Sequence, residues 1–302
     1  MTAVLVESGP DAGVIWHFGE PNHEQRALAA ASAWADLSHR SIITVSGQDR
    51  LTWLNDLTTQ EIAKLAPHTW SPALILDAQG HIQHQLVLMD DGERVWIHTE
   101  KSAEESLIAF LQKMVFMLRV EPKVVSDEYA LLRIPGASDN LGGPYEIIER
   151  SKLASRSEEL NASYTQVGSW ALEAERVEQH RARLNFETDY KSIPNELGFL
   201  NNAVHMRKGC YPGQETVAKV FNLGHPPRRL VMLHLDGSVV TMPEHGAKVF
   251  HGEKEVGFMG TLARHYELGP IALAVIRRTT PVDAMLTVDG VPANQEVIVP
   301  AE

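Results

Sequence analysis

Alternation of apolar and polar residues predicts that short strands dominate two parts of the chain. Residues 72–99 contain three such runs, separated by Gln79-Gly80 and Asp91-Gly92, which are dipeptides typical of hairpin turns. From Arg228 onward almost everything alternates, over residues 229–235, 247–251, 255–263, 271–278, 284–288 and 296–300. A sheet of that many strands leaves no unpaired edge when it closes into a barrel, so we expect a small β-barrel at this end of the chain.

Helical spacing of apolar residues predicts three helices before residue 120, over residues 22–35, 49–57 and 102–116. Two of them open with the spacing of a capping box. Asn22 precedes Gln25 by three residues, and Ser102 precedes Glu105 by the same interval. A further mixed helical segment over residues 169–184 follows a loosely repeated pattern of strand, loop and strand, which indicates a second α+β unit.

Composition describes an ordinary folded protein with more than one compact unit. The 302 residues exceed the usual size of one domain, and 44% of them are hydrophobic against 22% charged. A net charge of −12 disfavours direct binding to nucleic acid or anionic lipid. The chain has no apolar run near the roughly 20 residues of a membrane helix and no secretory leader pattern, so we expect a cytoplasmic protein.

Cys210, the only cysteine, lies in the stretch KGCYPGQETVAK over residues 208–219. Glycines at 209 and 213 allow a tight loop that could hold the thiol in one orientation. If Cys210 works as a thiolate, the nearby ammonium of Lys208 would lower its pKa. The alternative is that Cys210 is a small packed side chain and that the glycines merely shape a turn.

KGCYPGQE resembles the signature of the YgfZ-type folate-binding proteins, a branch of the superfamily that includes the glycine-cleavage aminomethyltransferase, or T-protein. The similarity continues in DLSHRSIITVSGQDRLTWLNDLTTQEIAKLAP, in LILDAQGHIQHQLVL and in the flanks of the signature, IPNELGFLNNAVHMRKGCYPGQETVAKVFNLGHPPRRLV. Together these stretches span residues 36–231, in the family's order. The signature residues would be Cys210 and Lys208, with Gly209, Tyr211, Gly213, Gln214 and Glu215 as companions.

The resemblance implies an α+β fold, a three-domain aminomethyltransferase-like ring of two α+β units and a C-terminal β-barrel. We expect a folate-binding domain over residues 1–121, a second α+β domain over 122–221 that ends in the signature loop, and a barrel over 222–302. The resemblance also allows a discontinuous first domain, with residues 46–121 inserted into it.

The same resemblance implies a tetrahydrofolate-binding protein that supports assembly or repair of iron–sulfur proteins and, through such enzymes, tRNA modification. Its partners would be folate, or a one-carbon derivative of it, and iron–sulfur client or assembly proteins. We expect it to act as a monomer.

A folate-dependent one-carbon transferase is the alternative function. T-proteins carry an Asp-Asp pair on a Gly-Gly hairpin, and one of those acids assists the transfer. On this chain the pair is replaced by His84 and Gln85. Glutamine does not exchange protons, so the reaction loses its acid–base group unless His84 or Cys210 takes over. Whether the protein is an enzyme therefore stays open at the sequence level.

Folate contacts are expected from Glu178, Arg176 and His84. In T-proteins an acid in a short run like Glu175-Arg176-Val177-Glu178 receives the pterin, so Glu178 would be the acceptor and Arg176 its companion. A solvated helix face is the competing interpretation. His81 and His84 point to opposite faces of a strand, so we expect no metal site there and only His84 facing a cavity.

Overall fold

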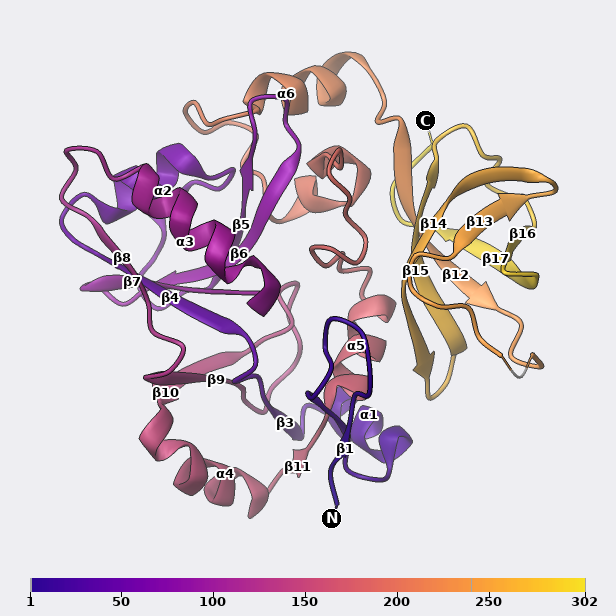
Figure 1. Cartoon of the computed structure of the whole chain (residues 1–302), viewed down its shortest axis with the longest axis horizontal. Coiled ribbons are helices and arrows are strands. Elements are labelled where there is room, and N and C mark those ends of the chain that lie inside the picture. The colour runs from indigo at the N-terminus through magenta and orange to yellow at the C-terminus, as the bar shows by residue number, and fades with distance from the viewer. Residues whose placement is uncertain (1, 240, 302) are drawn as a thin grey trace.

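The structure, a computed structural model, describes residues 2–239 and 241–301 and consists of two sheet units, a central segment and a barrel. Figure 1 shows the five-stranded sheet and the barrel on opposite sides of the molecule, with the central segment between them. The expected α+β class, with two α+β units and a C-terminal barrel, is confirmed.

A five-stranded antiparallel sheet is built from residues 41–124. Its strand order is β5 (Ser71–Leu76), β6 (Ile82–Asp90), β7 (Arg94–Thr99), β4 (Ser41–Ser46) and β8 (Glu121–Val124). Helices α2 (Arg50–Leu57) and α3 (Glu104–Lys113) cover one face, where Leu86 and Leu107 join a common core. Because side chains alternate along a strand, Gln85 and Val87 face the other way, toward the middle of the molecule.

A four-stranded sheet lies beside it, in the order β10 (Tyr145–Glu149), β9 (Tyr129–Arg133), β3 (Ala33–Asp36) and β11 (Thr165–Gln166). The chain enters this sheet with β3, leaves it to build the five-stranded sheet, and returns with β9. Its helices are α1 (Pro21–Ala29), α4 (Leu153–Asn161) and α5 (Ser169–Glu178). A two-stranded hairpin, β1 (Val4–Leu5) and β2 (Ile15–His17), precedes them.

The central segment, residues 179–213, carries no strand and two short 3-10 helices, η4 (Pro194–Glu196) and η5 (Phe199–Asn201). Phe199 belongs to a core cluster that also contains Leu74 of the five-stranded sheet and Leu230 of the barrel. This segment therefore joins the two sides of the molecule. Helix α6 (Gln214–Leu223) follows it, and the remaining 3-10 helices are η1 (Ile62–Lys64), η2 (Lys101–Ala103) and η3 (Arg150–Lys152).

The C-terminal strands close into a six-stranded barrel, as expected. The order around it is β12 (Arg228–Leu235), β15 (Gly269–Arg277), β14 (Lys254–His265), β13 (Lys248–His251), β16 (Leu286–Val288) and β17 (Val291–Val297). Asp289 and Gly290 join the last two strands with φ of 47° and 81°, the positive values that a two-residue hairpin turn requires. The strand expected at 296–300 in fact starts at Val291 and ends at Val297.

The helix expected over residues 22–35 is wrong in its second half. Helix α1 ends at Ala29, Ala31 adopts φ 55°, and Trp34 lies in β3. The capping box is wrong too, because the Gln25 amide is used elsewhere: it donates to the Arg264 carbonyl of the barrel and accepts from the Tyr266 amide. A contact across more than two hundred residues has displaced the local cap.

The helix expected over residues 102–116 is shorter than predicted. Ser102 falls in η2, and α3 begins at Glu104 without a side-chain cap. At the other end Phe116 adopts φ 45° and is 79% exposed, so the apolar spacing that predicted a helix continues beyond the helix itself. The spacing of apolar residues therefore predicts the position of this helix correctly but not the residues at which it begins and ends.

Candidate functional site: a signature loop and a central cavity

Lys208, the first residue of the signature, is buried against the end of α2. Its ammonium donates hydrogen bonds to the carbonyls of Asn55, Thr58 (2.5 Å) and Gln60 (2.9 Å), and it lies 5.3 Å from the centre of the Tyr211 ring. Carbonyls at the end of a helix lack intrahelical partners and attract cations. Burial lowers the pKa of Lys208 to about 8. This side chain therefore ties the signature loop to the five-stranded sheet unit.

Gly213 makes the second contact of the loop with that unit. It has φ of 77°, and a Cβ added to it would lie 2.6 Å from the Asp77 carbonyl oxygen and 2.7 Å from the Gly80 Cα. No residue larger than glycine fits without movement of the β5–β6 turn. Gly209, by contrast, has open space around it.

Cys210 lies at the surface, between these two anchored positions. Glu215, in the first turn of α6, is exposed as well, whereas the Gln214 amide lies 3.5 Å from the Lys208 carbonyl. The interpretation of Cys210 as a packed core residue does not agree with this exposure. The partners of the Lys208 ammonium are backbone carbonyls, so an effect of Lys208 on the thiol stays a prediction.

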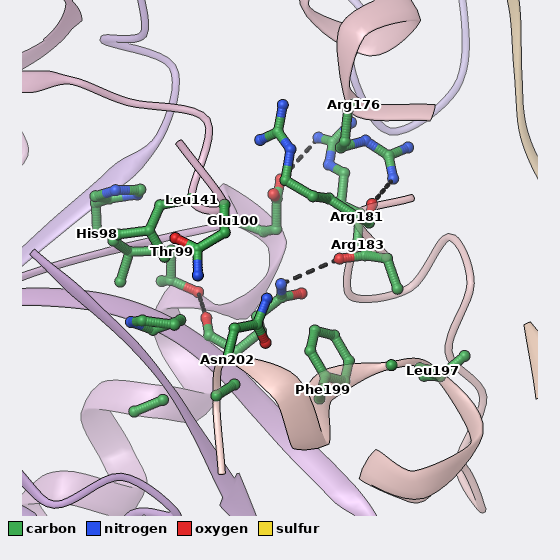
Figure 2. A pocket seen from close by; sticks show the side chains of 18 of the residues that line it. His98, Thr99, Glu100, Leu141, Arg176, Arg181, Arg183, Leu197, Phe199 and Asn202 are labelled. Carbon is green, nitrogen blue, oxygen red and sulfur yellow. Dashed lines mark hydrogen bonds and ion pairs between the residues drawn. The ribbon is translucent and has the colours of Figure 1, made fainter. Parts of the chain in front are cut away.

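A cavity of about 110 Å³ lies where the two sheets and the central segment meet. Its walls come from β6 and β7, from the loop before β10, and from residues 176–183 and 197–203. Figure 2 shows the side chains of Arg176, Arg181 and Arg183 on one side and His98 on the other. Cys210 does not line this cavity.

Ion pairs neutralise the arginine side of the cavity. Arg183 binds Asp11 (2.6 Å) and Glu100 (2.7 Å), and Arg176 binds Glu173 (2.7 Å) and Glu187 (3.1 Å). Burial opposes the ionisation of Glu100, but neighbouring arginines outweigh it and hold the pKa of Glu100 well below its usual range. Glu100 is therefore an anion that orients the Arg183 guanidinium.

Several polar atoms around the cavity are nevertheless buried without a hydrogen-bond partner. Within residues 2–239 and 241–301 these are both ring nitrogens of His98, Nε2 of His180, the Nε atoms of Arg40, Arg181 and Arg183, and Oδ1 of Asn202. Unpaired buried polar atoms are rare in native proteins and call for a water, an ion or a ligand. The cavity that these atoms share is therefore a candidate binding site.

The folate contacts expected from the sequence are only partly brought together. Arg176 lines the cavity. Glu178 lies instead beside His265, 3.5 Å away, in a separate pocket near α1. His84 faces α3, with its ring 6.1 Å from that of Phe110, and so it does not face the cavity as expected.

Gln85, on the opposite face of β6, lines the cavity in place of His84. Both ends of its amide are engaged, because Nε2 donates to the Ala182 carbonyl (3.1 Å) and Oε1 accepts from the Leu184 amide (2.9 Å). A carboxylate could not donate to Ala182, so the glutamine fixes the central segment at the T-protein acid position.

Sequence reasoning missed His98, Arg183 and Glu100. The only local signal is a polar run, His98-Thr99-Glu100, directly after the apolar residues of β7. In the described part of the chain no three His, Cys, Asp or Glu side chains are arranged to hold a metal ion. The helices of residues 2–239 and 241–301 include none with the length and apolarity to cross a membrane.

The two sheet units, the central segment and the barrel define the aminomethyltransferase class of fold. The chain aligns with the glycine cleavage system aminomethyltransferase T of Bartonella henselae with a TM-score of 0.81 and 16% identity, over 99% of this chain and 94% of that one. Residues 16–140 match the GCVT N-terminal domain family. The fold is therefore that of an aminomethyltransferase, and residues 16–140 are similar to the GCVT N-terminal domain family.

Two curated relatives are similar over most of the chain. An iron–sulfur cluster assembly factor IBA57 homolog, a mitochondrial protein of Mycosarcoma maydis, is 25% identical over 248 residues, which are 72% of this chain and 61% of that protein. A putative chloroplastic transferase of Arabidopsis thaliana is 23% identical over 278 residues, 76% of this chain and 63% of that protein. The matches thus span about three-fifths of the length of each relative.

Proposed function

We propose that this protein binds tetrahydrofolate, or a one-carbon derivative, and supports the assembly or repair of iron–sulfur proteins. The observation that carries the folate half is the set of unpaired buried polar atoms around a cavity in the T-protein fold. The iron–sulfur half rests on the similarity to the assembly factor of Mycosarcoma maydis. Iron–sulfur client or assembly proteins would be its partners, and tRNA modification would be affected through such clients.

The groups at the cavity fit a folate. A reduced pterin presents ring N–H and amino donors beside carbonyl and ring-nitrogen acceptors, which match a histidine, an amide oxygen and arginine Nε donors. The cavity is smaller than the roughly 300–1,000 Å³ of common ligand pockets. In this conformation it would therefore enclose only the ring end of such a ligand.

Calorimetry with reduced folates tests this half of the proposal. We expect saturable binding of tetrahydrofolate in the micromolar range, and no binding at high micromolar ligand would remove folate from the proposal. The one-carbon transferase is less well supported, since the Gln85 amide is held by two backbone groups and His84 faces α3. Formation of methylenetetrahydrofolate from an aminomethyl or N-methyl donor would restore that alternative.

Cys210 is the group we propose to act in iron–sulfur maturation, because it is exposed in a loop that is anchored on both sides. We expect Cys210→Ala to keep the melting temperature and the folate affinity, yet to abolish support of iron–sulfur enzyme activity in cells that lack the native protein. Lys219→Ala, an exposed change on α6, is the control. Full rescue by Cys210→Ala at matched expression would exclude the thiol as the functional group.

The compartment and the assembly state belong to the proposal as well. Both curated relatives are named as organellar proteins, whereas we propose that this chain acts as a cytoplasmic monomer. Fractionation of cells that express the native protein, and light scattering of the purified chain, test the two statements separately.

A further inference from the structure

His98 is the most completely buried of the unpaired polar side chains at the cavity. It is 1% exposed, and neither Nδ1 nor Nε2 has a hydrogen-bond partner among the residues that the structure describes. Alternation along β7 explains its position, because Val95 and Ile97 pack under the helices while His98 faces the cavity. Aromatic rings hold the imidazole in place: Tyr145 is 4.7 Å away and Trp70 is 5.6 Å away, both edge-on.

A neutral imidazole offers one N–H donor and one nitrogen acceptor, and both are unused here. Burial, with Arg40 nearby, lowers the pKa of His98 to about 3, so the ring is neutral near pH 7. Leaving a buried donor and acceptor without protein partners costs free energy that a ligand can recover. Because the two ring nitrogens point away from each other, a ligand meets them one at a time, and a flat heterocycle that carries both donors and acceptors complements either tautomer.

We infer that His98 binds and selects the pterin ring of the folate, through hydrogen bonds from its neutral imidazole. This inference rests on the proposed folate binding and adds that the pterin end of the ligand lies against His98. The arginine side lies across the cavity, as Figure 2 shows, and would face the other edge of the same ring. His98 is thereby a specificity-determining residue distinct from the signature loop.

The test compares His98→Leu, which removes both hydrogen-bonding atoms, with His98→Asn, which keeps a donor and an acceptor. His265→Leu is the matched control, since it removes another buried histidine, one outside this cavity. Affinity for tetrahydrofolate is measured by calorimetry. Ligand-observed NMR reports the binding of two fragments at millimolar concentration, 6-methyltetrahydropterin and p-aminobenzoylglutamate.

We expect His98→Leu to weaken tetrahydrofolate about tenfold or more and to lose 6-methyltetrahydropterin, while p-aminobenzoylglutamate binds as before. His98→Asn should recover part of the affinity, and His265→Leu should leave it unchanged. Binding by His98→Leu within about twofold of the native protein would overturn the inference. So would equal loss of both fragments, which indicates a collapsed cavity and a structural role. A native protein that binds no tetrahydrofolate would instead overturn the proposed function, and this inference with it.

Discussion

Replacing Lys208 by methionine removes the charge that joins the signature loop to α2 and retains most of the side-chain volume. Three backbone carbonyls then lose the ammonium that accounts for their contact with the loop. Hydrogen bonds to a charged group contribute roughly 1.5–3 kcal/mol each, but carbonyls at a helix end can regain water once the loop loosens. We therefore expect a total loss of about 2–4 kcal/mol rather than the full sum.

Thermal and urea unfolding followed by circular dichroism measure this loss. For a chain of this size about 1 kcal/mol lowers the melting temperature by roughly 2–4 °C, so a decrease on the order of 5–10 °C is expected. Lys219→Met is the control, because it removes the same charge from an exposed position on α6. Thiol labelling of Cys210 in the same variants separates an effect on stability from an effect on reactivity.

Two results would refute the reasoning. If Lys208→Met unfolds within about 0.5 kcal/mol of Lys219→Met, the buried ammonium is not an anchor. If labelling of Cys210 also slows in Lys208→Met while stability is unchanged, the lysine acts on the thiol, as the sequence first indicated. Faster labelling together with lower stability is the outcome that the structure favours.

Three further changes test other contacts. Gly213→Ala should cost about 2–4 kcal/mol, because it adds a clash to a positive φ, whereas Gly209→Ala should be close to neutral; unequal urea midpoints support this and equal ones contradict it. Gln85→Glu should lose about 1–3 kcal/mol in urea unfolding without gaining turnover from an aminomethyl donor, and measurable turnover would show that only the acid was missing. Burial lowers the pKa of His84 to about 4 and that of His98 to about 3, against 6.5 for the unfolded chain. Because the unfolded state then binds more protons, stability should fall between pH 6.5 and about 4, by about 2–3 kcal/mol for each histidine; a flat urea midpoint from pH 7 to 4.5 would contradict this.

The hairpins were predictable from their glycine-containing turn dipeptides, and the barrel from the number of alternating strands that must pair. Gln79-Gly80, Asp91-Gly92 and Asp289-Gly290 each stand where the structure turns, and Gly80, Gly92 and Gly290 all have positive φ. The start of α1 could not be foreseen, because the Gln25 side chain that would cap it locally is held by the barrel. Local rules succeed where the partners are local and fail where a distant strand competes for the same atoms.

The candidate site shows the same limit more sharply. The sequence placed His84 toward a cavity. Odd and even residues of a strand lie on opposite faces of the sheet, and no local signal says which face borders the cavity. An irregularity in the β5–β6 pairing at Ile75 and Leu76 adds to the difficulty of counting along this hairpin. The structure resolves the choice in favour of Gln85 and adds His98 from the neighbouring strand.

The charges around the cavity explain why a chain with a net charge of −12 can keep several arginines in its interior. Arg183 reaches Asp11 of the N-terminal hairpin loop and Glu100 at the end of β7, so one guanidinium joins segments that lie far apart in sequence. These pairs make the wall nearly neutral while leaving the arginine Nε atom unpaired. An ionic wall of this kind supplies fixed hydrogen-bond directions rather than net charge. Selection at this cavity therefore depends on where a ligand places its donors and acceptors, which is the property that a neutral His98 on the facing side can recognise.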